Sequence, residues 1–181
     1  MKLIVLDRDG VINHDSDAYI KSTEEWLPIE GSLEAIARLN HNGYTVVVAS
    51  NQSGLARGYF DIETLSAIHK KMDDMLNKLG GQIDAIFYCP HGPDDGCDCR
   101  KPKPGMLLEI GQRFNVPLSE VVFIGDSISD IKAANNAQAK AILVRTGKGV
   151  KAEKILQTEC KASDCVPVFD DLAAAVTDIL R

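Results

Sequence analysis

The amino-acid sequence predicts an α/β protein with a doubly wound, Rossmann-like parallel sheet. Two observations support this class. Short apolar runs rich in β-branched residues alternate with segments of helical periodicity along the chain. Three of these runs end in polar residues, at Asp7, Ser50 and Asp126. Alternating strands and helices form βαβ units, whose parallel sheet is covered by helices on both faces.

The expected strands are short and largely apolar, which is typical of strands buried in a parallel sheet. They cover residues 3–6, 44–49, 83–88, 121–124, 141–144 and 166–169. The expected helices run from Ser32 to about Gly43, from Asp61 to about Leu79, over 105–114, through 133–134, near 153–156 and over 172–180. Ser32 and Asp61 are expected to cap their helices, and Gly43 to end the first one.

Length and charge restrict the class of protein. The 181 residues, without an internal repeat or a linker, predict a single domain over residues 1–181. The net charge of −6 argues against a nucleic-acid surface, because phosphate backbones bind basic faces. The chain enters its first strand without a charged leader or a long apolar segment. We therefore expect a monomeric cytoplasmic protein with no membrane or nucleic-acid partner.

The first expected strand ends in Asp7-Arg8-Asp9-Gly10, which places two carboxylates at its carboxyl end. That edge of an open parallel sheet binds ligands, so Asp7 and Asp9 could address one substrate or one cation. A plain acidic turn is the simpler alternative. An EF-hand calcium loop also begins Asp-x-Asp. Calcium is disfavoured because Asp17 stands where the bidentate glutamate should be and a strand precedes the loop.

Ser50 and Asp126 follow two other expected strands, and a parallel sheet brings both to the same edge as Asp7. Asp7 and Asp126 offer carboxylate oxygens for Mg²⁺, which also keeps positions for phosphate and water. Ser50 and the amides after it can donate hydrogen bonds to phosphate oxygens, although a serine here can also be a turn residue. The three strand ends together favour a phosphate site.

Basic residues follow in the stretch Arg100-Lys101-Pro102-Lys103. Lys101, if it lies beside the crevice, would neutralise a transferring phosphoryl group. Arg100 could bind a second anionic group through its planar guanidinium. Lys103 is interpreted as an ordinary solvated residue.

Residues 89–99 contain a cluster of possible metal ligands. These are Cys89, His91, Cys97 and Cys99. In a cytosolic chain such a cluster favours a metal site over a disulfide framework. Three thiolates and one imidazole complete a tetrahedral Zn²⁺ site with no position for water, so the predicted zinc is structural. It would orient Arg100 and Lys101, which follow the last ligand. Cys160 and Cys165 receive no role.

Four short motifs together resemble the haloacid dehalogenase superfamily of phosphotransferases. They are Asp7-Arg8-Asp9-Gly10, Ser50 after a strand, Lys101 before a helix, and Gly125-Asp126-Ser127-Ile128-Ser129-Asp130. Each is weak alone, but they occur in the order of that family over residues 7–130.

The resemblance implies a role for each motif. Asp7 would be the nucleophile that forms an aspartyl-phosphate, and Asp9 the general acid and base. Mg²⁺ would be held by the Asp7 carboxylate, the Asp9 backbone carbonyl and Asp126. Ser50 and Lys101 would hold the phosphoryl oxygens, and Asp130 would support the lysine or the metal shell.

The gaps between the motifs are too short for the cap domain that many members of this superfamily insert. A capless protein must select its substrate with loops, here 15–19, 51–57 and the cysteine loop. The candidate substrate-binding residues are Asp15, Tyr19, Asn51, Gln52, Ser53, Arg57, Arg100 and Ser127. Ser127 departs from the lysine that many members carry after the motif aspartate.

The cysteine loop and the stretches 51–60 and 100–106 are similar to a subgroup that contains heptose bisphosphate and histidinol-phosphate phosphatases. The resemblance implies a small sugar bisphosphate as substrate and a step in making activated heptose for lipopolysaccharide or S-layers. Histidinol phosphate is the alternative substrate, and a DNA 3′-phosphatase is disfavoured by the negative charge. The non-enzyme alternatives are a phospho-accepting signalling module and a zinc-loop interaction protein. Repeated turnover of phosphate would distinguish the enzyme from both.

Overall fold

A computed structural model describes residues 1–159 and 166–181 and confirms the α/β class. The strands in this part of the chain are β1 (Lys2–Leu6), β2 (Tyr44–Asn51), β3 (Ala85–Cys89), β4 (Val122–Gly125), β5 (Lys140–Val144) and β6 (Val168–Phe169). The helices are α1 (Ser32–His41), α2 (Ile62–Asn77), α3 (Gly105–Phe114), the 3₁₀ turn η1 (Leu118–Glu120), α4 (Ile128–Asn136), α5 (Gly149–Glu159) and α6 (Leu172–Ile179). Cys160 and Cys165 lie outside the described residues.

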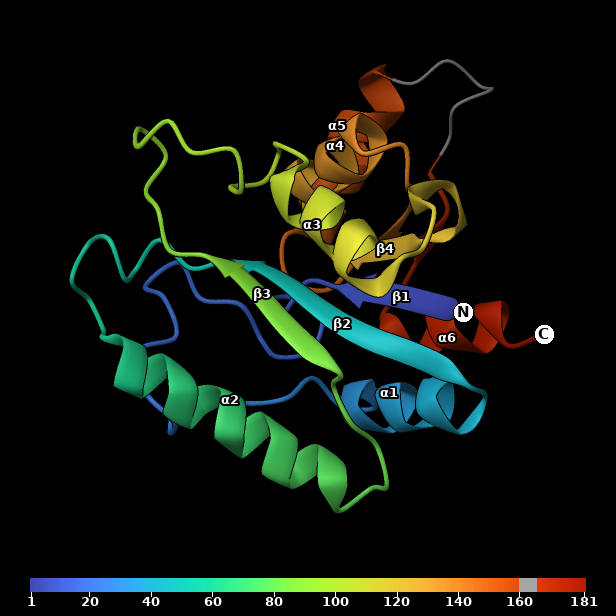
Figure 1. The fold of residues 1–181 in the computed structure, drawn as a ribbon, viewed down its shortest axis with the longest axis horizontal. Helices are drawn as coiled ribbons and strands as arrows, with labels where there is room; N and C mark the ends of the chain where they lie inside the picture. The colour runs from blue at the N-terminus through green and yellow to red at the C-terminus, as the bar shows by residue number, and fades with distance from the viewer. Residues whose placement is uncertain (160–165) are drawn as a thin grey trace.

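The strands form one parallel sheet in the order β3-β2-β1-β4-β5-β6 (Figure 1). The chain builds the sheet outward from β1 to β3 on one side, then returns to β4 beside β1 and builds outward to β6. The strand order therefore reverses at β1 and β4. A crevice opens at such a reversal, at the carboxyl ends of the strands.

Helices cover both faces of the sheet, with α1, α2 and α6 on one side and α3, α4 and α5 on the other (Figure 1). Alternate residues of β1 separate the two cores. Ile4 and Leu6 pack with the first group of helices, whereas Leu3 and Val5 pack with α3 and α4. This period of two follows from the pleat of a strand. Because both faces of β1 are buried, its carboxyl end is held firmly, and Asp7 is the next residue.

Two details near the helix ends differ from the prediction. Ser32 does not cap α1: its hydroxyl donates to the Ile12 carbonyl oxygen at 2.6 Å, and Gly31, with positive φ, precedes the helix. That bond ties α1 to the turn after β1. Leu79 lies beyond the end of α2 and is 40% exposed. Asp61 is confirmed as a cap, since its carboxylate accepts from the Thr64 amide at 2.8 Å.

None of the helices in the described part of the chain has the length and apolar character needed to cross a membrane.

Candidate active site

A pocket of about 310 Å³ opens at the carboxyl ends of the central strands. It is lined by Asp7, Asp9, Asp15, Ser16, Asp17, Tyr19, Ile20, Ser50, Asn51, Gln52, Ser53, Arg100, Lys101, Asp126, Ser127, Ser129, Asp130 and Lys148. The predicted catalytic residues and nearly all of the predicted substrate-binding residues are therefore brought together. Arg57 is the exception. It is exposed and lies outside the pocket lining, in the turn before Gly58.

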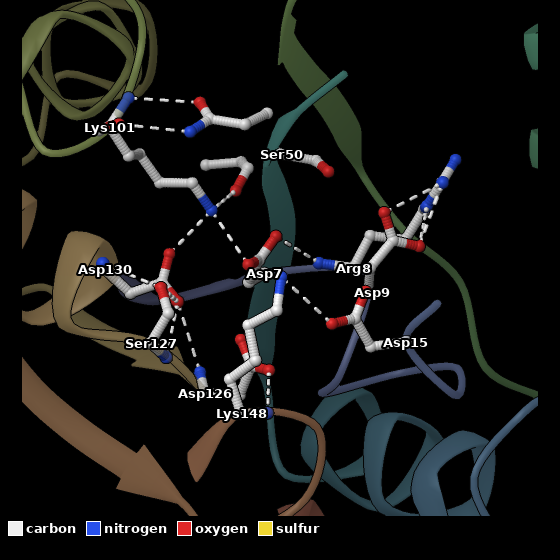
Figure 2. A network of polar contacts seen from close by, with 12 residues as sticks. Asp7, Arg8, Asp9, Asp15, Ser50, Lys101, Asp126, Ser127, Asp130 and Lys148 are labelled. Carbon is white, nitrogen blue, oxygen red and sulfur yellow. Dashed lines mark hydrogen bonds and ion pairs between the residues drawn. The ribbon is translucent and has the colours of Figure 1, made fainter. Parts of the chain in front are cut away.

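Lys101 is the central cation of the pocket. Its amine lies 2.9 Å from Asp7 Oδ2 and 2.7 Å from Asp130 Oδ1, and it donates to the Ala49 carbonyl oxygen at 2.9 Å (Figure 2). Burial alone would lower the pKa of Lys101, but the charges of Asp130 and Asp7 raise it overall. The ammonium therefore keeps its charge in a buried position and faces the carboxylate of Asp7.

Two buried carboxylates contact that ammonium, and a third, Asp126, lies next to them. Oxygens of Asp7, Asp126 and Asp130 lie within 4.8 Å of one another. Burial raises the pKa of Asp7 well above its ordinary value, and the charges of Asp130 and Asp126 add to the rise while Lys101 opposes it. Burial and Asp130 raise the pKa of Asp126 to about 7. One lysine does not balance three carboxylates, so a hard divalent cation fits this cluster.

Asp130 is committed to the protein itself. Its Oδ2 accepts from the Ser127 hydroxyl at 2.7 Å and from the Ser127 and Asp126 amides at 3.0 and 3.2 Å. This is half of a capping box at the start of α4, and the other oxygen pairs with Lys101. Asp7 and Asp126 are then the carboxylates left for a cation, as the sequence predicts. Ser127 lines the pocket, but its hydroxyl is used in the cap.

Two glycines allow the Asp126 carboxylate to lie against the turn after β1. Gly10 and Gly147 both have positive φ, 84° and 57°, which disfavours other residues. A Cβ at either position would collide with Asp126 Oδ2. Gly10 is therefore required by the site and is more than a turn former.

Asp9 is held apart from the carboxylate cluster. Arg8 donates to both of its oxygens at 3.0 Å, Asn13 donates to Oδ1 at 2.8 Å and Gln52 to Oδ2 at 3.0 Å (Figure 2 draws the Arg8 contacts). Burial alone would raise the pKa of Asp9, but Arg8, Asn13 and Gln52 lower it overall. Asp9 is thus kept ionised in this conformation.

The partner of Arg8 on its other side is His69 of α2. A terminal guanidinium nitrogen of Arg8, Nη1, lies 3.3 Å from His69 Nε2, and Arg8 is completely buried. Burial and the charge of Arg8 lower the pKa of His69 to about 4, so the neutral ring accepts the hydrogen bond. Sequence reasoning missed this pair, because the two residues are 61 positions apart and no pattern connects them.

Asn51 and Gln52, predicted to bind substrate, also build the site. The Asn51 side chain accepts from the Lys101 amide at 3.0 Å and donates to the Lys101 carbonyl oxygen at 3.1 Å. Gln52 donates to the Ser50 hydroxyl at 2.8 Å as well as to Asp9. Because the Ser50 oxygen accepts that bond, its own hydrogen is left to donate into the pocket.

The rim of the pocket consists of more exposed side chains. Tyr19 has a φ of 67°, unusual for a bulky residue, and its ring lies 5.1 Å from that of Tyr59. Lys148 Nζ lies 3.3 Å from Asp15 Oδ2. On the side of the cysteine loop (residues 89–99), Arg100 donates to the His91 carbonyl oxygen at 3.3 Å.

The predicted zinc ligands converge. Ligand atoms of Cys89, His91, Cys97 and Cys99 lie within 4.8 Å of one another. His91 Nδ1 lies 3.5 Å from Cys89 Sγ and 3.3 Å from Cys99 Sγ. Burial and the neighbouring Cys99 raise the pKa of Cys89 to about 12, which a bound cation would reverse. Lys103, predicted to be only solvated, donates to the Cys97 carbonyl oxygen at 2.6 Å from an exposed position.

Comparisons with known proteins agree with this geometry. Residues 98–175 match a family model described as HAD-hydrolase-like. The chain is 52% identical to the D-glycero-β-D-manno-heptose-1,7-bisphosphate 7-phosphatase of Pseudomonas aeruginosa, over 99% of this chain and 98% of that one. It is also 52% identical to the enzyme of that name from Bordetella bronchiseptica, over 100% and 99% of the two chains.

A solved structure gives the same result. The crystal structure of the B. bronchiseptica D,D-heptose 1,7-bisphosphate phosphatase, complexed with magnesium and phosphate, superposes with a TM-score of 0.94 at 53% identity, over 99% of this chain and 98% of that one. Fold, site and relatives agree, and the resemblance inferred from the four motifs is confirmed. The chain belongs to the haloacid dehalogenase-like hydrolases, in the family of the heptose 1,7-bisphosphate phosphatases.

Proposed function

We propose that the protein is a Mg²⁺-dependent phosphatase that removes the C7 phosphate of D-glycero-β-D-manno-heptose 1,7-bisphosphate, in the synthesis of activated heptose. One observation carries the proposal. The pocket that gathers Asp7, Lys101 and Asp126 lies in a chain 52% identical, over nearly its whole length, to enzymes of that name. A single-domain, monomeric, cytoplasmic enzyme without a nucleic-acid partner, as the sequence predicts, is part of this proposal.

The Asp7 and Asp126 carboxylates and the Asp9 backbone carbonyl would hold Mg²⁺. When bound, the ion would reduce the repulsion between the nucleophile and the phosphate and would stabilise charge in the transition state. The excess of buried carboxylates over cations in the pocket supports this assignment.

The reaction divides into two displacements at phosphorus. An Asp7 oxygen forms a bond to the phosphorus of the C7 phosphate as the bond from phosphorus to the sugar oxygen breaks. Asp9 gives the departing sugar oxygen a proton. In the second step Asp9 takes a proton from water, whose oxygen attacks the aspartyl-phosphate. Inorganic phosphate leaves and the Asp7 carboxylate is restored. Lys101 and the Ser50 hydroxyl bind the phosphoryl oxygens in both steps.

Asp9 has to exchange its contact with Arg8 before it can act as an acid, because that contact holds its pKa low. Gln52 also binds Asp9 and lines the pocket, so a substrate that enters next to Gln52 could displace Asp9 from Arg8. Arg8 would then set the balance between the resting and the active position of Asp9.

Phosphate release from purified protein with Mg²⁺ tests the substrate. We expect kcat/KM for the β-heptose bisphosphate to exceed that for histidinol phosphate and for an aryl phosphate by at least about 100-fold, a difference of roughly 3 kcal/mol in transition-state binding. The α anomer serves as the matched comparison. Preference for histidinol phosphate, or equal activity on all substrates, would contradict the proposal.

Magnesium is expected to stabilise the protein more at high pH. The folded-state pKa of Asp126, about 7, lies above its ordinary value of 3.8. Ionisation of Asp126 therefore destabilises the metal-free fold as the pH rises from about 4 through 7. Since Mg²⁺ binds the ionised form, millimolar Mg²⁺ should raise the Tm by about 3–5 °C at pH 8 and by less at pH 5.5. Equal shifts at both pH values, or an unchanged shift in Asp126→Asn, would contradict the assignment.

We further propose Zn²⁺ at Cys89, His91, Cys97 and Cys99, in a structural role. The supporting observation is the chemistry of the four donors, which provide three thiolates and one imidazole within reach of one ion.

A further inference from the structure

Lys148 is a cation of the pocket that has no part in the mechanism above. It belongs to the turn between β5 and α5 and was not a candidate in the sequence. Its backbone is fixed against the reacting centre. The Lys148 amide donates to Asp126 Oδ2 at 2.8 Å, and the neighbouring Thr146 hydroxyl donates to the Gly10 carbonyl oxygen at 2.6 Å. The start of the side chain is therefore placed as firmly as the carboxylate cluster.

The side chain of Lys148, in contrast, is available to a ligand. It is 56% exposed, and its ionic partner in the described structure is Asp15 at 3.3 Å. The side chain of Lys101 is 3% exposed and has three acceptors within 3 Å. Figure 2 shows Lys148 extended from beside Asp126 toward Asp15. Its amine thus lies at the mouth of the pocket, and that of Lys101 at the base.

The charge of the pocket makes an exposed cation at the mouth significant. Six aspartates but three cationic side chains line the described pocket, and one of the three is the fully engaged Lys101. A bisphosphate would bring a second anionic group to this acidic mouth. Ser127, at the same end of the sheet, offers a hydroxyl that the α4 cap already uses.

We propose that Lys148 binds the phosphate of the substrate that does not react. This inference rests on the proposed function, since it requires a bisphosphate with one phosphate at Asp7. The amine would exchange Asp15 for the phosphate oxygens, a charge-assisted contact. Asp15 would then be free to accept from sugar hydroxyls. Arg100 contacts the cysteine loop, which follows β3, whereas Lys148 follows β5. The two cations at the mouth of the pocket, Arg100 and Lys148, therefore lie on opposite sides of β1.

The variant Lys148→Met tests the proposal, because it removes the charged amine but keeps an unbranched side chain as far as Cε and the amide bond to Asp126. The assay is phosphate release with Mg²⁺ from heptose 1,7-bisphosphate and from heptose 7-phosphate, the same sugar without the second phosphate. We expect KM for the bisphosphate to rise about tenfold with kcat unchanged, as for one lost charge-assisted contact at a partly exposed site. KM for the monophosphate should change less than about twofold.

Two further variants complete the experiment. Lys151 is an exposed lysine in the first turn of α5, and Lys151→Met should leave both KM values unchanged. Lys148→Arg should restore most of the affinity for the bisphosphate. If the wild type prefers the bisphosphate, but Lys148→Met raises KM equally for both substrates or for neither, the role of Lys148 is wrong and the proposed function stands. A wild type with no preference for the bisphosphate would overturn the proposed function together with it.

Discussion

Replacing Asp7 with asparagine is expected to lower phosphate release by at least about 10⁴-fold while raising the thermal stability of the protein. The loss follows from its role as nucleophile, which a neutral amide cannot fill. The gain in stability follows from burial and from the repulsion by Asp130 and Asp126, which raise the pKa of Asp7 in the fold. A neutral side chain of the same shape removes that repulsion, and Lys101 keeps Asp130 as its partner.

Steady-state phosphate release with Mg²⁺ and thermal unfolding without added Mg²⁺ measure the two effects. Asp74→Asn is the matched control, because Asp74 is an exposed carboxylate of α2 that pairs with Lys70 on the surface. It should change neither quantity by a measurable amount. Activity within tenfold of the wild type in Asp7→Asn, or a Tm below that of the control, would contradict the assignment.

The same substitution at Asp9 should have the opposite effect on stability. Arg8 is completely buried and donates to both Asp9 oxygens. Without the negative charge the guanidinium is left uncompensated, so Asp9→Asn should lower the free energy of unfolding by about 2–3 kcal/mol as well as the activity. The catalytic roles alone would lead to a loss of turnover without unfolding at both aspartates. The pairing with Arg8 changes that expectation for Asp9.

A double variant separates the two roles of Asp9. In Arg8→Met, Asp9→Asn the uncompensated charge is gone, so stability should return toward the wild-type value while activity stays lost. An Asp9→Asn protein as stable as the wild type would show that Arg8 does not depend on Asp9 for its burial.

The sequence predicts the fold and the base of the pocket because both follow from local rules. An apolar strand that ends in a polar residue identifies Asp7, Ser50 and Asp126, and strand order then brings them together. The bounds of α3 agree with the prediction to the residue. Lys148 lies four residues beyond the end of β5, so the rule of a polar residue directly after a strand does not find it.

What the sequence misses depends on tertiary contacts. The hydroxyl of Ser32 bonds to the Ile12 carbonyl oxygen because α1 packs against the turn after β1, a contact that the residues next to Ser32 in the sequence do not reveal. Arg8 and His69 meet through the packing of α2. Arg57 was expected in the site because its loop contributes Gln52 and Ser53, but its side chain is exposed and lies outside the pocket lining.

Removal of zinc is expected to unfold the cysteine loop while the sheet stays folded. Zinc binding can supply on the order of 10 kcal/mol to the ordering of a small site, which is comparable to the net stability of a whole domain. The two cores on either side of β1 contain most of the buried apolar residues, and of residues 90–98 only Cys97, which is partly buried, packs against one of them. The variant Cys97→Ser, or treatment with a zinc chelator followed by dialysis, should therefore expose residues 90–98 to proteases with little change in helix content.

Activity should fall with the order of the loop, by about 10- to 100-fold, because the backbone of Lys101 is held from two sides. Cys99, the last ligand of the proposed zinc site, lies two residues before it, and the Asn51 side chain binds its amide and carbonyl groups from β2. Without zinc the Lys101 backbone keeps the Asn51 contact and loses its anchor on the side of the cysteine loop, so the ammonium is positioned less firmly against Asp7. Zinc should restore the dialysed wild type but not Cys97→Ser, and Asn51→Ala should reduce activity further in the zinc-free protein than in the zinc-bound one. A zinc-free protein with full activity and an intact loop would show that the loop is ordered by its own packing, and that the position of Lys101 is set by β2 alone.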